Sequence, residues 1–152
     1  MNRVDPPVLF LSAKPLVSDR LRRSLEQNSA GAVVVFEGVV RDHHQGRSVV
    51  RLEYSAFDPV VEAEWQNLRE RARASFEVKA ITGQHRVGTL GIGDSAVWIG
   101  VASAHRASGF AACQWLIEAI KRELPIWKKE HYADGSIDWR HDVGPDPART
   151  VI

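Results

Sequence analysis

The chain has 152 residues, a length that fits one globular domain. Its composition, 44% hydrophobic and 26% charged, excludes a disordered, collagen-like or coiled-coil protein. Twenty Lys and Arg against 19 Asp and Glu leave a net charge of +1, so no bulk charge draws the protein to nucleic acid or to a membrane surface. A single cysteine excludes an intrachain disulfide and a cysteine-rich zinc site. We therefore expect any anion to be bound by a local cluster of cations.

The two ends of the chain carry little chemistry. The first residues contain no apolar signal-like segment, and the most apolar run, 32–36, is far too short to span a bilayer. Together with the lone thiol, this favours a cytoplasmic protein. We expect residues 1–152 to form a single domain whose last part, 142–152, is a flexible tail.

The first part of the chain, up to residue 56, predicts three strands and one short helix. A short strand over 7–12 is followed by a short helix from Ser18 to about Gln27. The β-rich run 32–41 contains Gly38, which suggests a bulge, and 49–56 alternates like a half-buried strand. We expect these two strands to form a hairpin with a charged tip.

The first long helix starts at Asp58–Pro59, because proline is favoured at the first helical position. Apolar residues then recur at steps of three and four from Val61 to Phe76 and form one stripe. Strands over 78–87 and 96–102 follow, joined by the glycine-rich turn 91–94.

A second long helix follows His105–Arg106 and is ended by Pro125. Its predicted apolar face consists of Phe110, Cys113, Leu116, Ile117, Ile120 and Leu124. Segments 126–132 and 137–140 then predict a last hairpin around Asp134–Gly135. The pattern as a whole predicts an α+β fold with a mostly antiparallel sheet and two main helices.

The only thiol is the obvious candidate nucleophile, but its position argues against that role. Cys113 falls in the middle of the apolar face of the second long helix. A cysteine in such a place is usually a small buried hydrophobe whose pKa is raised. A thiol enzyme remains the alternative, to be tested by alkylation.

Two lysines flank the proline that ends this helix. Lys121 lies at the edge of the apolar face, and Lys128 follows seven residues later in a segment that can turn back as a strand. Two converging ammonium groups lower each other's pKa and form an anion trap or a proton acceptor. The alternative is a snorkelling Lys121 and an edge strand protected by Lys128.

A further set of cations could hold a phosphate. His105 and Arg106 stand where a strand ends and a helix begins, and a helix N-terminus suits a phosphate. Arg41 and His43 could add to the same pocket, and Arg140 is a further candidate. No pair among the six histidines has the spacing that places two imidazoles on one helical face, and no phosphate-loop or dinucleotide glycine motif occurs, so we expect no metal and no cofactor.

Four segments together resemble the family of large, catalytic subunits of molybdopterin synthase: 31–43, 85–88, 101–106 and 121–130. Their order and spacing cover roughly 31–141, and the combination of Ser-Ala-His-Arg with Lys-x₃-Pro-x-Trp-Lys is specific. The resemblance implies an α/β hammerhead fold and a homodimer. It also implies a small ubiquitin-like sulfur-carrier subunit at each end, which makes a heterotetramer.

The resemblance further implies a sulfurtransferase. The carrier's C-terminal Gly-Gly thiocarboxylate would enter the pocket and supply sulfur to cyclic pyranopterin monophosphate (precursor Z), building the dithiolene of molybdopterin. Carried over residue by residue, the catalytic positions fall on Lys121 and Lys128. The substrate-binding positions fall on Arg41, His105, Arg106, Lys129, Glu130 and Arg140.

One position departs from the family pattern, because many members have lysine where this chain has Val39. We therefore assign no phosphate binding to that side chain. The residues alone also permit a second function, a non-catalytic module whose cations dock an anionic or carboxylate tail.

Overall fold

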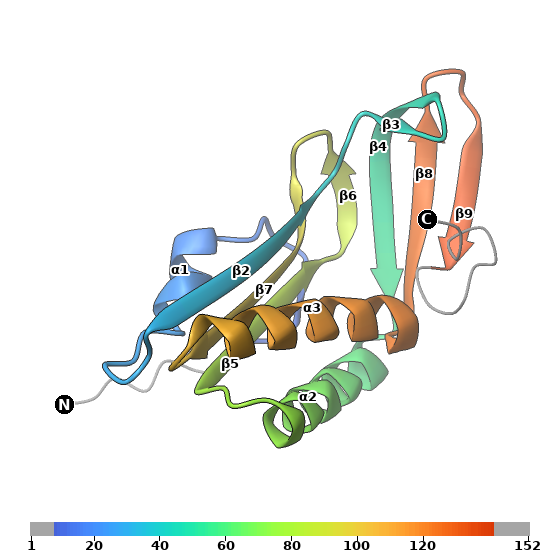
Figure 1. The fold of residues 1–152 in the computed structure, drawn as a ribbon. Helices are drawn as coiled ribbons and strands as arrows, with labels where there is room; N and C mark the ends of the chain where they lie inside the picture. The colour runs from blue at the N-terminus through green and yellow to red at the C-terminus, as the bar shows by residue number, and fades with distance from the viewer. Residues whose placement is uncertain (1–7, 142–152) are drawn as a thin grey trace.

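The computed structural model describes residues 8–141, so the predicted tail, 142–152, lies outside the described residues (Figure 1). Three helices and two sheets make up this part of the chain. The helices are α1 (Ser18–Arg23), α2 (Asp58–Ser75) and α3 (Arg106–Glu123). None of the described helices is both long and apolar enough to cross a membrane.

The first sheet has the strand order β1-β5-β7-β2. Its strands are β1 (Leu11–Ser12), β5 (Ala80–Arg86), β7 (Ser95–Ser103) and β2 (Ala32–Val39). All neighbours are antiparallel except β1 and β5. β2 forms one edge of this sheet, and the side chains of Val33 and Val35 on it are exposed.

The second sheet rises from the end of α3 and contains five strands (Figure 1). They are β3 (His43–His44), β4 (Arg47–Ala56), β6 (Gly88–Gly91), β8 (Ile126–Tyr132) and β9 (Ile137–His141). The order is β3-β4-β8-β9, and β6 also pairs with β4. The α+β class with mostly antiparallel strands is thus confirmed.

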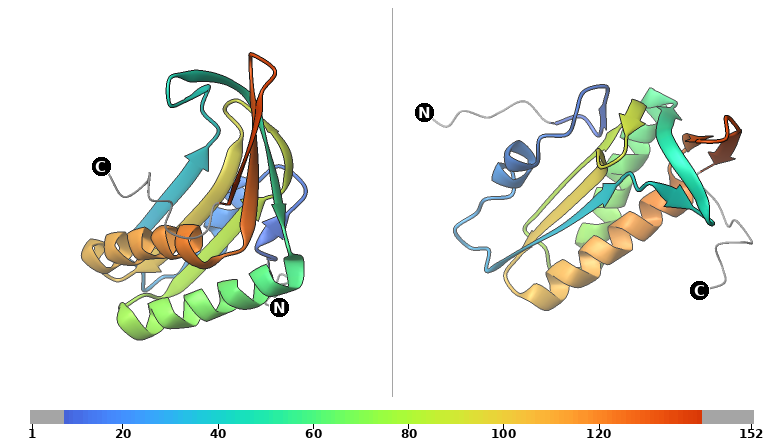
Figure 2. Two further views of the ribbon diagram at one scale, coloured as in Figure 1. Left: turned by 90° about the vertical axis from the view of Figure 1, so that its right-hand side faces the viewer. Right: turned by 90° about the horizontal axis from the view of Figure 1, so that it is seen from above.

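The helices cover both faces of the first sheet (Figure 2). α3 packs on β2 and β7, and α2 packs against α3. The stripe predicted for α2 is its buried face, with Trp65 almost completely enclosed. On the other face, Leu21 and Leu25 pack with Trp98 in a separate small core. Alternation along β7 sends successive side chains to these two cores.

Two sequence expectations fail here, and one short strand was not predicted. β2 and β4 do not form a hairpin: β2 pairs with β7 and β4 pairs with β3, β6 and β8. β6, which precedes the predicted turn at 91–94, was not predicted as a strand, whereas the turn itself is present and is closed by the Asp94 N–H donating to the Gly91 carbonyl. Phe110, predicted in the core, is 62% exposed. Which strands pair depends on residues far apart in the sequence, and the burial of Phe110 depends on how far α3 extends over its sheet. Local sequence patterns specify neither the strand partners nor this overlap.

Candidate active site

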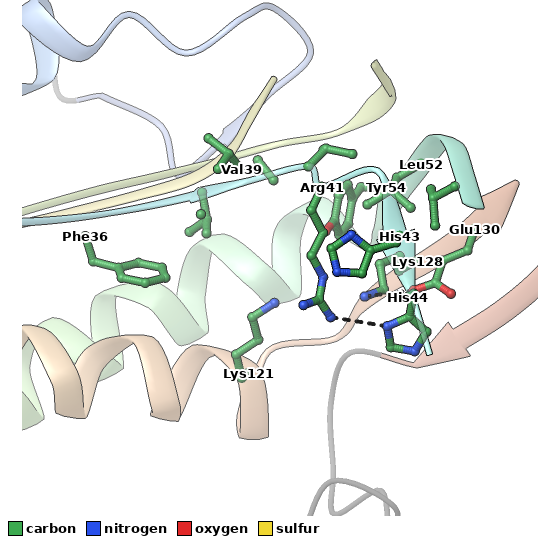
Figure 3. Close-up of a pocket in the computed structure, with 15 residues that line it drawn as sticks. Phe36, Val39, Arg41, His43, His44, Leu52, Tyr54, Lys121, Lys128 and Glu130 are labelled. Atoms are coloured by element: carbon green, nitrogen blue, oxygen red, sulfur yellow. Dashed lines mark hydrogen bonds and ion pairs between the residues drawn. The ribbon is translucent and has the colours of Figure 1, made fainter. Parts of the chain in front are cut away.

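A cavity of about 540 Å³ opens where the C-terminal end of α3 meets both sheets (Figure 3). Its polar wall gathers cations, imidazoles and one carboxylate from four separate segments of the chain. These polar lining residues are Arg41, His43, His44, Tyr54, Lys121, Lys128 and Glu130. Phe36, Val39, Leu52 and Val97 are among the apolar lining residues. The cavity therefore combines an apolar floor with a concentration of positive charge in a nearly neutral protein.

The two lysines reach this cavity from either side of the proline break. α3 ends at Glu123, Leu124 adopts an extended conformation, and β8 begins at Ile126. Lys121 therefore points from the last turn of the helix and Lys128 from the strand that returns beside it (Figure 3). The sharp change of direction, which Pro125 enforces by blocking a longer helix, brings both ammonium groups to one space.

A buried carboxylate holds Lys128 in place. Glu130 is only 2% exposed, and its Oε1 lies 3.2 Å from Lys128 Nζ. The Tyr132 hydroxyl donates to Oε2 of Glu130, and Arg140 Nε lies 3.5 Å from the same oxygen. Alternation along β8 puts residues 128, 130 and 132 on one face of the strand. The carboxylate thus fixes three partners from two adjacent strands.

This network keeps Glu130 ionised. Burial by itself raises the pKa of Glu130, but the Tyr132 hydrogen bond and the Lys128 ammonium outweigh it, so the pKa lies below its ordinary value. Burial and the hydrogen bond to Glu130 raise the pKa of Tyr132 to about 12. At neutral pH the carboxylate is charged and the phenol is not, which is the state that best orders Lys128.

Arg41 is held by a histidine that the sequence reading did not assign to the site. Nη2 of Arg41 lies 3.5 Å from Nδ1 of His44. Burial lowers the pKa of His44; Glu130 opposes this, and Arg140, Lys128 and Arg41 lower it further. A neutral ring with Nδ1 as acceptor suits the Arg41 guanidinium. His43 was the histidine predicted to join Arg41, and it also lines the cavity, but the contact with Arg41 is made by its neighbour His44.

His105 and Arg106 do not reach this cavity within one chain. His105 precedes α3 and Lys121 lies in its last turn, so about 22 Å of helix separates the two ends at 1.5 Å per residue (Figure 1). Both residues are exposed, and the Ser103 hydroxyl donates to the His105 carbonyl at 2.7 Å to shape the corner. The idea that they share a pocket with Arg41 in a single chain is therefore wrong.

Two further carried-over positions lie outside the cavity. Lys129 points to the opposite face of β8, where its Nζ is 3.7 Å from Glu53 and 5.1 Å from the ring centre of Trp139. Arg140 lies behind Glu130 rather than in the lining. Val39, the departure from the family pattern, is an apolar part of the wall. Within residues 8–141, no three metal-ligating side chains gather into a group.

Cys113 lies away from the cavity and inside the core. Its side chain is 4% exposed, its thiol faces the Ile99 carbonyl at 3.8 Å, and burial raises the pKa of the thiol. The predicted burial of Cys113 in the core is confirmed.

We expect native protein to react with iodoacetamide at neutral pH at least about ten times more slowly than unfolded protein, because both burial and a raised pKa suppress the thiolate. Cys113→Ala should retain nearly full activity. Mass spectrometry of a labelling time course measures the first quantity. Rapid labelling with parallel loss of activity would restore the thiol-enzyme interpretation.

Comparisons with known proteins identify the family of the chain. The family model described as "MoaE protein" matches residues 11–123. A molybdopterin synthase catalytic subunit 1 from Mycobacterium tuberculosis is 38% identical over 90% of this chain and 92% of its own length. One from a Nostoc species is 36% identical over 82% of this chain and 76% of its own.

Solved structures show the same fold. The crystal structure of molybdopterin synthase from Staphylococcus aureus superposes with a TM-score of 0.82 at 33% identity, covering 87% of this chain and 96% of that one. A complex of subunits 1 and 2 of molybdopterin-converting factor from Helicobacter pylori gives 0.69 at 18% identity, covering 86% and 87%. At that identity the likeness extends to the fold alone.

The fold and the matches define an enzyme of molybdenum cofactor biosynthesis. The chain belongs to the family of molybdopterin synthase catalytic subunits. That family is the one indicated by the order of the sequence segments around the two lysines.

Proposed function

We propose that this chain transfers sulfur from the C-terminal thiocarboxylate of a small ubiquitin-like carrier subunit to precursor Z, forming the dithiolene of molybdopterin. The observation that carries the proposal is the convergence of Lys121, Lys128 and Arg41 on one cavity. A cyclic phosphate and a thiocarboxylate are both anions, and each needs a cation in a partly dehydrated space. The apolar floor leaves room for the pterin ring.

The three cations divide the work by their surroundings. Arg41, held against His44, is suited to a bidentate contact with the cyclic phosphate. Lys128, fixed by the ionised Glu130, is suited to stabilising negative charge that develops as sulfur attacks the pterin carbon. Lys121 comes from the opposite wall and is placed to move a proton or to meet the carrier's terminal group. The sulfur donor is external, which agrees with a core role for Cys113.

The direct test mixes purified protein with thiocarboxylated carrier and precursor Z and measures the dithiolene product. We expect product to accumulate with two sulfurs consumed per pterin, and carrier lacking the terminal sulfur to give none. Tight carrier binding without any sulfur transfer would instead support the non-catalytic binding module. The Helicobacter pylori complex, which joins two subunits of its converting factor, is the precedent for such a partner.

We further propose that a second copy of the chain supplies His105 and Arg106 to the cavity. The two residues are exposed and are of the types that bind phosphate. They lie at the N-terminal end of α3, however, and cannot reach the cavity at its C-terminal end within the same chain. A two-fold dimer in which α3 of one copy approaches the cavity of the other resolves this conflict. Together with one carrier per cavity, the assembly is a heterotetramer.

Mixing inactive variants tests the composite site. Lys121→Ala and Arg106→Ala should each be nearly inactive. After the two are unfolded and refolded together, random pairing should restore about a quarter of wild-type activity, because half of the dimers are mixed and each has one intact site. Refolding either variant alone is the control. No recovery in the mixture would place Arg106 outside the partner's site.

A further inference from the structure

A second concave region lies on the other side of the first sheet, far from the lysine cavity. It encloses about 740 Å³ between α1, α2 and the outer edge of β5, and we call it the β5-edge groove. Its lining includes five cations, and none of the lining residues is an Asp or Glu. The cations are Arg20 and Arg23 of α1, Arg69 and Arg73 of α2, and Lys79 before β5.

These cations have no acidic partners in the described part of the chain, whereas their helix neighbours do. Arg22 of α1 lies 3.8 Å from Glu26, and Arg71 of α2 lies 2.9 Å from Glu123. None of these four residues lines the β5-edge groove. With a net charge of only +1 for the whole protein, five uncompensated cations around one concavity form a strong local positive field.

Arg69 shows the cost of this arrangement most clearly. It is half-buried, its Nη1 donates to Gln66 Oε1 at 3.0 Å, and its Nε is buried with no hydrogen-bond partner in the described residues. Burial lowers the pKa of Arg69, and the positive charge of Arg73 lowers it further. The guanidinium is therefore partly desolvated beside a like charge, and an anion contacting its remaining N–H groups would offset that repulsion.

The backbone of β5 adds neutral donors to the same place. β1 pairs only with His85 and Arg86, so over 80–83 the described chain adds no strand to the outer edge of β5. The N–H of His85 points to that edge, where it donates to the Phe10 carbonyl at 2.6 Å. Since N–H directions repeat every second residue, those of Ile81 and Gly83 face the open edge. An open sheet edge with unpaired N–H groups is a known form of anion site.

Side-chain hydroxyl and amide groups complete the lining. The Ser24 and Thr82 hydroxyls lie 2.7 Å apart and bridge α1 to β5, and Gln27 binds the Lys79 carbonyl at 3.2 Å. The donors therefore come from both helices and from the strand between them. Because the cations are spread along the groove, they match a ligand that carries several negative charges better than a ligand that carries one.

We propose that the β5-edge groove binds a small molecule that carries two or more phosphate groups. Arginines from α1 and α2 contact the phosphates from opposite sides, and the free N–H groups of β5 meet them at the strand edge. The site is independent of sulfur transfer, because it shares no residue with the lysine cavity.

Calorimetric titration of the full chain with inorganic pyrophosphate and with ADP, at about 0.15 M salt to screen non-specific attraction, tests the proposal. We expect saturable binding of at least one of them. Binding of both assigns recognition to the phosphates alone, and binding of ADP only shows that the nucleoside also contributes; both results support the site. No saturable binding of either at millimolar concentration overturns it.

Matched variants locate the bound ligand. Arg69→Gln with Arg73→Gln should weaken binding about a hundredfold, at roughly tenfold for each charged hydrogen-bond donor removed. Arg22→Gln, on the same α1 but outside the β5-edge groove, should leave it unchanged, as should Arg41→Gln in the lysine cavity. Binding that is lost in Arg41→Gln and kept in the double variant would overturn the proposal by placing the ligand in the lysine cavity.

Thermal melting supplies a second readout, because it also measures the stability of the protein without ligand. Arg69→Met keeps an apolar stem and removes the buried unpartnered donor, so the empty variant should melt at or above the temperature of the wild type. At the same concentration, pyrophosphate should raise the melting temperature of the wild type by more than that of this variant, because the variant binds it about tenfold more weakly. Sulfur transfer should be equal in both proteins. A variant that melts well below the wild type and gains as much stability from pyrophosphate as the wild type does would contradict the role of Arg69.

Discussion

Replacing Lys121 by alanine should abolish molybdopterin formation while leaving the protein folded. Lys121 is half-buried in the last turn of α3 and contributes its ammonium group to the cavity wall. Loss of a group that moves a proton or stabilises charge at the reacting atoms lowers a rate by about 10²–10⁴-fold. Single-turnover formation of the dithiolene with thiocarboxylated carrier measures the effect.

The neighbouring residue is a matched control. Arg122 lies on the same turn of α3, is exposed, and pairs with Glu123 at 3.5 Å outside the cavity lining. Arg122→Ala should keep near-normal turnover, and both variants should unfold within about 0.5 kcal/mol of the wild type, as is usual for changes outside the core. Near-normal turnover by Lys121→Ala would remove the central support for the proposed chemistry. Lys128→Ala is a poorer test, because it also leaves the buried Glu130 uncompensated.

Replacing Glu130 by alanine should produce the largest loss of stability. The change strands the Lys128 ammonium and the Tyr132 hydroxyl in a region from which water is largely excluded. Removing one member of a buried ion pair costs about 3–5 kcal/mol. Urea unfolding followed by circular dichroism measures this. Glu118→Ala, at an exposed position on α3, is the control and should change stability by less than about 0.5 kcal/mol.

The same carboxylate predicts a pH dependence. Its folded-state pKa lies below the ordinary value of 4.5, so its contribution is fully present above that value and is lost as the pH falls through the lower folded-state pKa. The difference in stability between wild type and Glu130→Gln should therefore shrink as the pH is lowered below about 4.5. A difference that is constant over this range would show that Glu130 is not ionised in the folded protein.

Local patterns were sufficient for much of the fold. The stripe on α2 and the proline at the end of α3 are short-range signals, and the last hairpin follows from its turn residues. Strand partnership was not predictable in this way, because Ala32 pairs with Ser103 and Arg51 pairs with both Gly91 and His131. Nothing near Ala32 or Arg51 in the sequence specifies a partner so far along the chain.

In the site, too, features set by nearby residues were predictable and features set by three-dimensional packing were not. Lys121 and Lys128 are seven residues apart around an obligatory break, so their convergence follows from local geometry. The separation of His105 from Lys121 was also calculable, since a helix between them was predicted and a helix is a rigid rod of known rise. His44 and Tyr132 act through Arg41 and Glu130, and only three-dimensional packing shows such support.

The open strand β2 has a consequence for handling the protein. β2 is an edge strand whose outer backbone N–H and C=O groups are open to pairing, and Val33, Val35 and Phe36 beside them are exposed. Such an edge can pair with a strand of another chain. We therefore expect the protein to aggregate through this edge at high concentration, and Val35→Lys, which places a charge beside the edge, should reduce that aggregation.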